Sequence, residues 1–440
     1  PFLPEAVSVS PHGVGPKRIA VSAMCCAFRY VKAVVGAQLQ KGGQIHLCSA
    51  GVAGRRLVIG EAAQRQEFCQ LQRWGNAVQP DPQDKFQLLQ LSKEVQATVE
   101  RVQPRQDQLA AQHSLLRDLV QAASEVLEGC SVTLFGSAAS GLWTAFSDLD
   151  VCLIAPGIDD RHKQSRALRK LAPALKRASA RHHVRLRSGA YIPILRWVPR
   201  RPGLLACDIS INNVLGVANS RLVQRYVQID DRLRCLGLCV KTWAHRRGIN
   251  DRSRGTLSSF ALTLMLVHFL QHRQPPVLPS LQDLAVVRGY PPIFVKGADC
   301  RFCSSANEIG EELERLGGVK LPNEEELGLL LREFFLYYGH TYQHGVIAIR
   351  DRTSFAPYAD EEHCYLSIDN PFEPGVDVAT VDVREYTRLR EEFRRAHALL
   401  SEGHRFDEVC ASPPSLGHSP LAEPLQPGVN APLGFSPHKP

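Results

Sequence analysis

Two aspartates at the start of a short apolar run limit the folds open to the first half of this chain. Residues 131–135 alternate like a strand, residues 136–137 read as a turn, and residues 148–154 read as a second strand. Because strand side chains alternate between two faces, Asp148 and Asp150 project on one face and their apolar neighbours on the other. Carboxylates crowded on one face repel each other unless a cation or a proton neutralises them. A solvated turn would also explain an isolated Asp-x-Asp pair.

A third carboxylate lies in another strand pattern, residues 204–211, where Asp208 faces away from the apolar residues beside it. If this strand lies beside residues 148–154, three carboxylates converge and form a site for hard divalent cations, which prefer oxygen ligands. Two such ions can activate an attacking hydroxyl and stabilise leaving pyrophosphate. The glycine of Gly136-Ser137 allows close backbone approach, and the serine hydroxyl with free N–H groups can hold phosphate.

The remaining patterns change from mixed to helical along the chain. Strands are predicted at 182–187 and 191–198, and helices at 85–128 (broken near Pro104), 138–145, 163–180, 232–247, 257–272 and 324–342. We expect an α+β fold: a mixed unit with a mostly antiparallel sheet, then an α-helical unit, with a cleft between them. Residues 1–84 carry no clear period. Residues 411–440 hold eight prolines and are predicted to be a disordered tail.

Charge and cysteine usage restrict the partners and the compartment. The chain of 440 residues has a net charge of +8, and residues 161–201 hold thirteen Lys or Arg and no acid. This block is either a solvated face or a surface for a polyanion, and nucleic acid is the favoured partner because phosphate neutralisation releases counterions. Thirteen scattered cysteines predict reduced thiols in a cytoplasmic or similar compartment, with the nucleus or an organelle as alternatives. None of the apolar runs is long enough to predict a membrane-spanning helix.

Two small groups of metal-binding residue types favour structural explanations. Cys300 and Cys303 form one Cys-x-x-Cys without a second pair nearby, whereas a structural zinc site needs four ligands. His340 and His344 are spaced i, i+4, but no glutamate follows His340 as the metalloprotease pattern requires. We interpret the histidines as helix-surface residues. Residues 1–60, with seven Lys or Arg and one acid, are a weak sign of a transit peptide.

Five ordered motifs together resemble a known family. They are the Gly-Ser pair with the three aspartates, VKTWAHRRGI (240–249), RGTLSSFALTLMLVHFLQ (254–271), PPVLPSLQDL (275–284) and DNPFEP (369–374). The set is similar to the RNA terminal uridylyltransferases and cytoplasmic-type poly(A) polymerases of the DNA polymerase β nucleotidyltransferase superfamily. The resemblance runs from about residue 105 to about residue 400. It implies a palm domain at 85–225, a helical domain at 226–405 with a PAP-associated region near 324–378, and a tail at 406–440.

The resemblance also implies roles for individual residues. Asp148, Asp150 and Asp208 would ligate two Mg²⁺ or Mn²⁺ ions, and Asp208 would be the general base. The residues implied to bind the nucleoside triphosphate are Gly136, Ser137, Asn219, Lys241, His245, Ser259, Phe260 and Glu373. From the basic block, we predict that Arg166, Arg169 and Lys170 contact RNA. The expected substrates are an RNA 3′ end and UTP or ATP. RNA-targeting proteins are possible partners, and we expect a monomer.

Several positions depart from the family pattern. His245 stands where a second lysine is usual, and Phe260 keeps the stacking ring of a tyrosine without its hydroxyl. Asn370 and Val376 replace an acid and a histidine of the uridylyltransferases. The first expectation is therefore uridylyl transfer to RNA 3′ ends, with adenylyl transfer as the alternative. An inactive RNA-binding relative is disfavoured by the complete set of carboxylates, and a small-molecule nucleotidyltransferase by the basic block.

Overall fold

The computed structural model describes residues 81–189, 192–201, 203–318, 322–342, 345–351, 366–381 and 383–412. The chain divides into a unit of Pro1–Ala62 and a unit of Ala63–Pro440, and every described residue belongs to the second unit. The expectations for residues 1–80, for the tail from residue 413 and for His344 lie outside the described residues. No helix in the described part of the chain is long and apolar enough to cross a membrane.

The N-terminal helical region consists of two helices, α3 (Pro82–Val102) and α4 (Gln106–Ser124). Asp81 caps α3 by accepting a hydrogen bond from the Asp84 amide, and Pro82 occupies the first turn, where a missing N–H costs nothing. Pro104 lies in the break between the helices, as the sequence predicts, because proline cannot donate the helical hydrogen bond.

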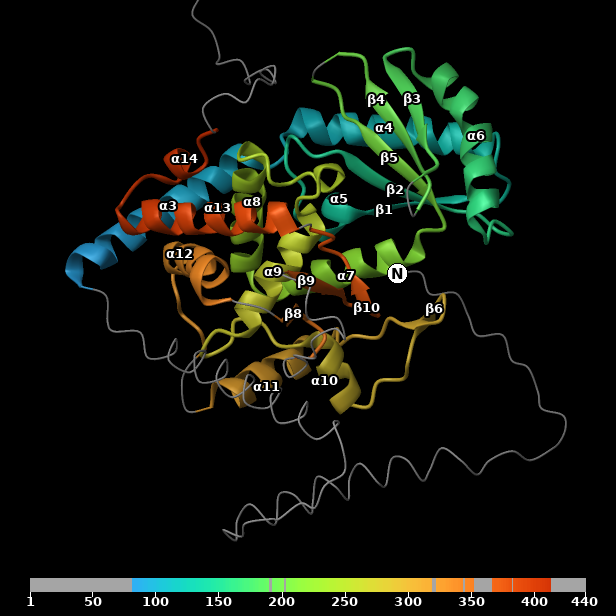
Figure 1. The fold of residues 1–440 in the computed structure, drawn as a ribbon. Helices are drawn as coiled ribbons and strands as arrows, with labels where there is room; N and C mark the ends of the chain where they lie inside the picture. Colours follow the sequence, from blue (N-terminus) through green and yellow to red (C-terminus); the bar gives the residue numbers. More distant parts are fainter. Residues whose placement is uncertain are drawn as a thin grey trace, which may run out of the picture. The chain divides into compact units, whose positions relative to one another are not determined.

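A five-stranded sheet forms the first half of the fold (Figure 1). Its strands are β1 (Ser131–Phe135), β2 (Leu149–Ile154), β3 (His182–Arg187), β4 (Ile194–Pro199) and β5 (Cys207–Ile211). The spatial order is β1-β2-β5-β4-β3, and only the central pair β2–β5 is parallel. The prediction of a mostly antiparallel sheet is therefore confirmed.

One face of this sheet is covered by α4 and by α6 (Arg161–Ala178), and a hydrophobic core lies between them. The sheet residues in this core are every second residue of the central strands, as half-buried strands require. They include Leu149, Val151, Leu153, Leu195, Trp197, Cys207, Ile209 and Ile211. The alternate residues, among them Asp150 and Asp208, project from the opposite face, where α5 (Gly136–Ser140) and α7 (Val214–Ile229) pack against β1 and β2.

The short helix α5 differs from its prediction. We expected a turn at Gly136-Ser137 followed by a helix at 138–145, but the helix begins at Gly136 and ends at Ser140. It ends there because Gly141 adopts a left-handed conformation with φ of 85°, a common helix C-terminal signal. The residues up to Ser147 form turns that place Asp148 at the start of β2.

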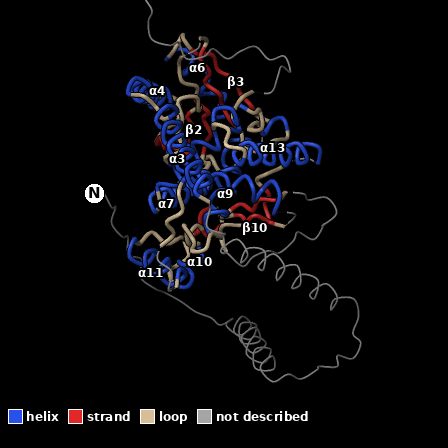
Figure 2. Tube along the Cα trace, turned by 90° about the vertical axis from the view of Figure 1, so that its left-hand side faces the viewer, coloured by secondary structure: helices blue, strands red, loops and turns tan. Residues whose placement is uncertain are grey.

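The second half of the fold is mostly helical (Figure 2). Its helices are α8 (Asp231–Arg246), a 3-10 turn (Arg252–Arg254), α9 (Ser259–Gln271), α10 (Leu281–Val287), α11 (Ala306–Gly317), α12 (Leu327–Leu336), a π-helical turn (Tyr337–Thr341), α13 (Val383–Ser401) and α14 (Phe406–Val409). The predicted helix at 324–342 is thus a shorter helix followed by a π turn. His340 lies in that turn, with its ring 5.4 Å from the ring of His397.

Five short strands belong to the described part of this half. They are β6 (Phe294–Val295), β7 (Ala298–Asp299), β8 (Val346–Ile347), β9 (Ser367–Asn370) and β10 (Glu373–Asp377). β6 and β7 pair as a hairpin, and β10, β9 and β8 form a three-stranded sheet. The predicted base-recognition segment, 369–374, spans the β9–β10 connection.

A second hydrophobic core joins the helices, and it includes residues from both ends of the described chain. Leu91, Val95 and Val99 of α3 pack in it, as do Leu222 and Tyr226 of α7. The helix α3 therefore packs with the helical half although it precedes the sheet in sequence. The proposed domain boundary at residues 225 and 226 falls within α7, which contributes to both halves.

Candidate active site

The strand pairing brings the predicted carboxylates together on one face of the sheet. In the parallel pair β2–β5, Asp150 lies directly opposite Asp208. Their neighbours Val151 and Ile209 are fully buried on the other face. Asp148 immediately precedes β2, two residues before Asp150. The alternation seen in the sequence and the adjacency of the two strands thus produce a cluster of three carboxylates.

Arg196 of β4 bridges two of these carboxylates, and the sequence analysis missed it. Its Nε atom donates to Oδ1 of Asp208 at 2.8 Å, and its Nη2 atom donates to Oδ2 of Asp148 at 2.7 Å. In the antiparallel pair β4–β5, Arg196 lies directly opposite Asp208. An arginine between Leu195 and Trp197 in an apolar strand was a usable signal, because a partly buried guanidinium needs a partner.

The carboxylates are perturbed by their surroundings. Burial raises the pKa of Asp150 to about 7, and the charge of Asp208 adds to this rise. Burial also raises the pKa of Asp208, although Arg196 opposes the shift. Near neutral pH, Asp150 is therefore divided between its protonated and ionised forms, and a nearby cation would favour the ionised form.

A pocket of about 450 Å³ lies beside the carboxylates, within the size range of small-molecule sites. Eight of the residues singled out from the sequence line it: Gly136, Ser137, Asp148, Asp150, Lys241, His245, Ser259 and Phe260. Further lining residues that the sequence analysis missed include Phe146, Ser147, Ser220, Asn250 and Thr263. Residues from the sheet half and from the helical half therefore form one pocket.

The basic end of the pocket contains Lys241 and His245. Lys241 Nζ donates to Ser147 Oγ at 2.7 Å and to the Leu142 carbonyl at 3.2 Å. Burial lowers the pKa of Lys241 to about 8, while Asp150 opposes the shift. His245, one turn later on α8, stacks on Phe146 with ring centroids 4.8 Å apart. Burial lowers the pKa of His245, so its ring is neutral at pH 7.

Gly136 is held in place by a hydrogen bond that the sequence did not predict. Its N–H donates to Ser220 Oγ at 2.7 Å, so this amide is engaged within the protein and is not free for phosphate. The backbone φ is 64°, and a Cβ atom at this position would lie 2.1 Å from Oδ2 of Asp150. Only glycine therefore fits beside this carboxylate.

Three residues predicted to act at the site, Asp208, Asn219 and Glu373, are not among those that line the pocket. Asp208 is joined to the site through Arg196, as described above. The other two belong to a hydrogen-bonded chain in which Asn219 donates to Asn370 at 3.4 Å and Asn370 donates to Glu373 at 2.8 Å. The side-chain oxygen of Asn219 is buried without a partner among the described residues. Asn219 immediately precedes Ser220, which does line the pocket.

Ser259 and Phe260 stand at the start of α9, where Ser258 caps the helix. The Ser259 hydroxyl exchanges hydrogen bonds with the side-chain amide of Asn250 at 3.0 and 3.3 Å. Phe260 packs partly against the helical core and partly faces the pocket. The ring therefore contributes to the hydrophobic core and is also accessible from the pocket.

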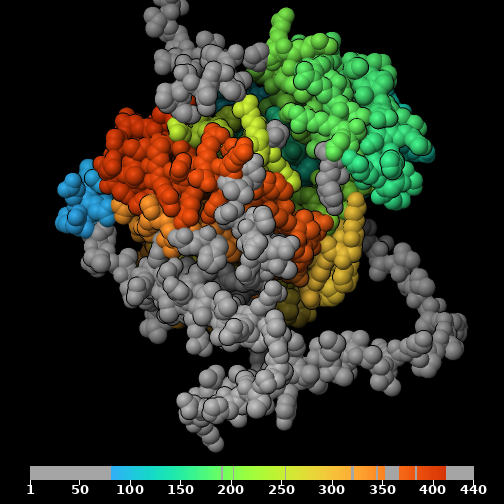
Figure 3. Space-filling view, viewed as in Figure 1, coloured from blue at the N-terminus to red at the C-terminus, as the bar shows by residue number. Residues whose placement is uncertain are grey.

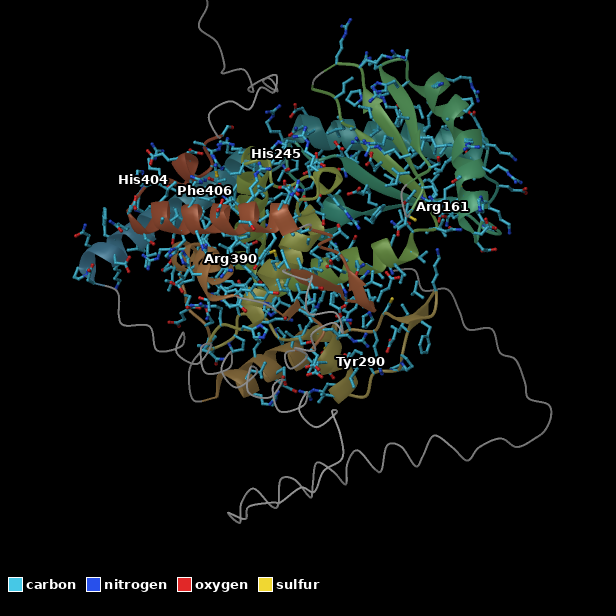
Figure 4. All side chains as sticks on the ribbon, viewed as in Figure 1. Arg161, His245, Tyr290, Arg390, His404 and Phe406 are labelled. Carbon is cyan, nitrogen blue, oxygen red and sulfur yellow. The ribbon has the colours of Figure 1, made fainter. Side chains whose placement is uncertain are left out.

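The structure does not bring the predicted RNA contacts to the carboxylates. Arg166, Arg169 and Lys170 are exposed on α6, which covers the face of the sheet opposite the aspartates. In Figure 3, the green side chains of α6, β3 and β4 form the upper right of the view, and the red side chains of α13 lie toward the left. In Figure 4, Arg161, at the start of α6, lies well apart from His245 of α8.

Other arginines do share the face of the carboxylates. In the antiparallel pair β3–β4, Arg185 lies opposite Arg196, and Arg187 lies opposite Ile194. The strand residues between them, Leu186 and Leu195, pack against the core on the other face. A row of side chains therefore runs across the sheet from Asp150 through Asp208 and Arg196 to Arg185.

The chemistry of the carboxylates fits divalent metal ions. Three carboxylates supply hard oxygen ligands, and Gly136 lets the backbone approach Asp150 closely. Among the described residues, no three His, Cys, Asp or Glu side chains are gathered closely enough to hold a metal ion. Asp148 and Asp208 both contact the guanidinium of Arg196 in this arrangement. Cys300 and Cys303 are buried free thiols.

The fold and the site together define a nucleotidyltransferase palm of the polymerase β type. The sequence profile of the "Poly(A) RNA polymerase, mitochondrial-like, central palm domain" matches residues 91–228. This range contains the five-stranded sheet and all three aspartates.

Comparison with known proteins then shows which sequences and structures the chain resembles. The chain is 32% identical over 288 residues to poly(A) RNA polymerase cid13 of Schizosaccharomyces pombe, covering 63% of this chain and 47% of the relative. It is 33% identical over 252 residues to human terminal uridylyltransferase 4, covering 56% of this chain and 15% of that protein. A solved structure of the Cid1 poly(U) polymerase matches with a TM-score of 0.62 at 26% identity, covering 74% of this chain and 99% of the other.

The chain is thus similar to the RNA terminal uridylyltransferases and the poly(A) RNA polymerases, and its residues 91–228 match the palm domain of such enzymes. It spans half the length, or much less, of these two curated relatives. The expected fold, a polymerase-β-like palm followed by a helical domain, is confirmed by the structure and by the Cid1 match.

Proposed function

We propose that this chain is a template-independent RNA 3′-terminal nucleotidyltransferase that adds UMP from UTP, with adenylyl transfer from ATP as the alternative. The observation that carries the proposal is the pairing of Asp150 with Asp208 on adjacent strands, at the wall of a pocket that also contains Lys241. Carboxylates next to a buried lysine suit phosphoryl transfer, in which catalysis is mainly positioning and charge stabilisation. The names of the relatives point to the same reaction.

We propose the following roles for the residues of the site. Asp148, Asp150 and Asp208 would hold two Mg²⁺ or Mn²⁺ ions, which supply charge stabilisation at the phosphates and lower the pKa of the attacking hydroxyl. Asp208 accepts the proton of the RNA 3′ hydroxyl. The 3′ oxygen bonds to the α-phosphorus while the bond from that phosphorus to the bridging oxygen breaks, releasing pyrophosphate. Lys241, Ser137 and Ser259 bind the triphosphate from the pocket wall.

We assign recognition of the nucleobase to Phe260 and to the hydrogen-bonded side chains of Asn219, Asn370 and Glu373. A phenylalanine ring stacks on any base, so stacking cannot choose between UTP and ATP. Choice must come from hydrogen bonds, where a missing partner costs about 1–3 kcal/mol. The buried side-chain oxygen of Asn219 can accept a hydrogen bond from a ribose hydroxyl or a base N–H. Val376 is exposed on β10, where it offers no hydrogen bond, so we expect a modest preference for UTP.

The lysine predicts how affinity for nucleotide depends on pH. Since the pKa of Lys241 is about 8, we expect nucleoside triphosphate to bind more weakly as the pH rises through 8 and the lysine loses its charge. Titration of the protein with a fluorescent UTP analogue across this range measures the effect. Lys241→Met should weaken binding about tenfold to a hundredfold and abolish the loss of affinity above pH 8.

Lys163→Met is the matched control for this experiment. Lys163 is an exposed lysine of α6, remote from the pocket, and it pairs with Asp160. This variant should keep the affinity and the pH profile of the parent protein. If Lys241→Met has the pH profile of the parent protein, Lys241 does not bind the triphosphate.

RNA binding should depend more on β3 than on α6. Arg185 and Arg187 share the face of the carboxylates, and the charge of Arg187 reaches Asp208. Replacing both with glutamine should weaken binding of every RNA sequence and reduce the salt slope by about 0.7 for each phosphate that the protein no longer neutralises. The α6 variant Arg166→Gln/Arg169→Gln/Lys170→Gln tests the RNA-binding residues predicted from the sequence. A larger effect from α6 would reverse this assignment.

The direct test of the function is nucleotide addition. The protein is incubated with a labelled oligoribonucleotide, with Mg²⁺ or Mn²⁺, and with each of the four triphosphates separately. Extension with UTP in preference to ATP supports the uridylyl assignment, and a tenfold preference for ATP supports the poly(A) alternative. No extension with any triphosphate, under conditions where the RNA is bound, would favour an inactive RNA-binding relative. We further propose that the chain acts as a monomer and that RNA-targeting proteins select its substrates.

A further inference from the structure

Arg196 is the clearest feature of the site that the proposed function does not explain. It extends from β4 across β5, and one guanidinium donates to carboxylates on two different segments, Asp208 at 2.8 Å and Asp148 at 2.7 Å. Because Arg196 and Asp208 lie opposite each other in register, their side chains share one face of the sheet. The backbone therefore fixes the position of the guanidinium close to both carboxylates.

The surroundings make this arrangement stabilising. The Arg196 side chain is 26% exposed and the Asp208 side chain 23%. Carboxylates crowded in a partly buried site repel each other, and one cation that contacts two of them offsets this repulsion. The planar guanidinium suits this position because its donors point in fixed, divergent directions. In the arrangement that the structure shows, Arg196 supplies positive charge where a metal ion would supply it.

A divalent cation at the same carboxylates competes with this guanidinium. The two cations have the same sign and use the same pair of side chains, and like charges within a few ångströms repel strongly in a partly buried site. Asp148 is the more exposed of the two carboxylates, with 45% of its side chain accessible, and it precedes the strand. Asp208 is held within β5 beside Arg196. The contact with Asp148 is therefore the one that can open.

We propose that Arg196 is an internal cation that occupies the place of a divalent metal between Asp148 and Asp208, and that it releases Asp148 when the metal binds. This inference rests on the metal-dependent function proposed above. Arg196 is then a positioning residue with two opposed effects. It stabilises the carboxylate cluster in the metal-free protein, and it weakens the affinity of the cluster for metal ions.

Metal titration without RNA or nucleotide tests this inference. Free Mn²⁺ is measured by electron paramagnetic resonance during titration of the full chain and of Arg196→Met. Since the variant has no charge-assisted hydrogen bond to break, it should bind Mn²⁺ about tenfold more tightly than the parent. In EDTA its Tm should fall by a few degrees, and saturating Mn²⁺ should remove most of this difference.

Two further variants sharpen the result. Arg185→Met removes an exposed arginine of β3 on the same face, for which the structure shows no ion pair to the aspartates, and it should leave Mn²⁺ affinity within about twofold. Arg196→Lys keeps the charge, but its single ammonium cannot span both carboxylates as a guanidinium does. It should bind Mn²⁺ more tightly than the parent and less tightly than Arg196→Met. If Arg196→Met does not fold, the Mn²⁺ affinity of Arg196→Lys relative to the parent protein tests the inference by itself.

The outcomes separate this inference from the proposed function. Mn²⁺ affinity that is unchanged or weaker in both Arg196 variants overturns the inference, and weaker affinity would instead make Arg196 a support for the metal ligands. Asp150→Asn is expected to bind no Mn²⁺. If the parent protein also binds no Mn²⁺, the proposed metal-dependent function and the inference are both wrong. The inference is supported if Arg196→Met binds Mn²⁺ more tightly than the parent protein and Arg185→Met binds it with the parent's affinity.

Discussion

Replacing Asp150 with asparagine is expected to abolish nucleotide addition and, at the same time, to stabilise the metal-free protein. The loss of a metal ligand at the reacting centre should lower the rate by ~10³-fold or more. The gain in stability has a separate cause, because the folded protein holds this carboxylate in a buried site next to Asp208. Asparagine has the same shape and carries no charge to repel its neighbour.

The sign of the stability change depends on pH. The pKa of Asp150 is raised from 3.8 to about 7, so the folded protein binds this proton more tightly than the unfolded chain does. The cost of ionised Asp150 is absent below about pH 4, grows as the pH rises toward 7 and is complete above it. Asp150→Asn should therefore stabilise the protein at pH 8 in EDTA by a few kcal/mol, since a tenfold change in proton affinity corresponds to about 1.4 kcal/mol. The stabilisation should be smaller at pH 5.

Thermal unfolding at both pH values and a nucleotide-addition assay measure the two effects. Asp159→Asn is the matched control, since Asp159 is exposed in the loop before α6. This control should change neither activity nor the pH dependence of stability. An Asp150→Asn protein that adds nucleotides at a near-normal rate would exclude Asp150 as a metal ligand. Equal stability of variant and parent at pH 8 would show that the carboxylate is not strained.

Substitution of Gly136 by alanine should be the second most damaging change. The new Cβ would lie 2.1 Å from Oδ2 of Asp150, and the φ of 64° is unfavourable for any residue other than glycine. Either the backbone or the carboxylate must move, so we expect nucleotide addition to fall about a hundredfold or more, because misplacement of a reacting group by about 1 Å can have this effect.

Gly157→Ala separates the contact from the backbone strain. Gly157 has a φ of 71°, similar to that of Gly136, but a Cβ there would meet nothing within 4 Å. Both alanine variants should lose similar stability from the left-handed backbone, of order 1 kcal/mol, and Gly136→Ala more from the clash. Only Gly136→Ala should lose activity. Equal activity of the two proteins would show that Asp150 tolerates displacement.

Much of the secondary structure could be predicted because its signals are local. The alternation in residues 148–154 and 204–211 indicated which side of each strand carries an aspartate, and both are strands in the structure. Helix ends were less accurate. The helix expected at 138–145 begins at Gly136, since Gly141 ends it after five residues, and the segment 324–342 changes to a π turn at Tyr337. Ends depend on single turns of backbone, which periodicity does not report.

The parts of the site that the sequence did not predict involve side chains from distant segments. Arg196 became part of the carboxylate cluster only because β4 pairs with β5 in the register that places it opposite Asp208. The engaged amide of Gly136 depends on Ser220, which follows it by 84 residues. The basic helix at 163–180 was expected near the RNA, but its apolar stripe packs on the face of the sheet that carries no aspartates.

The sequence by itself determined the order of strands and helices, the face of each strand that is polar, and the presence of three carboxylates, a lysine and an aromatic ring in a family pattern. These properties depend on neighbouring residues, whose alternation or helical spacing follows from backbone geometry. The tertiary structure alone decided which strands are adjacent, which arginine neutralises the aspartates, and which basic surface shares their face. Register and face are set when both sides of a sheet are packed at once, and that packing joins residues that are far apart in the chain.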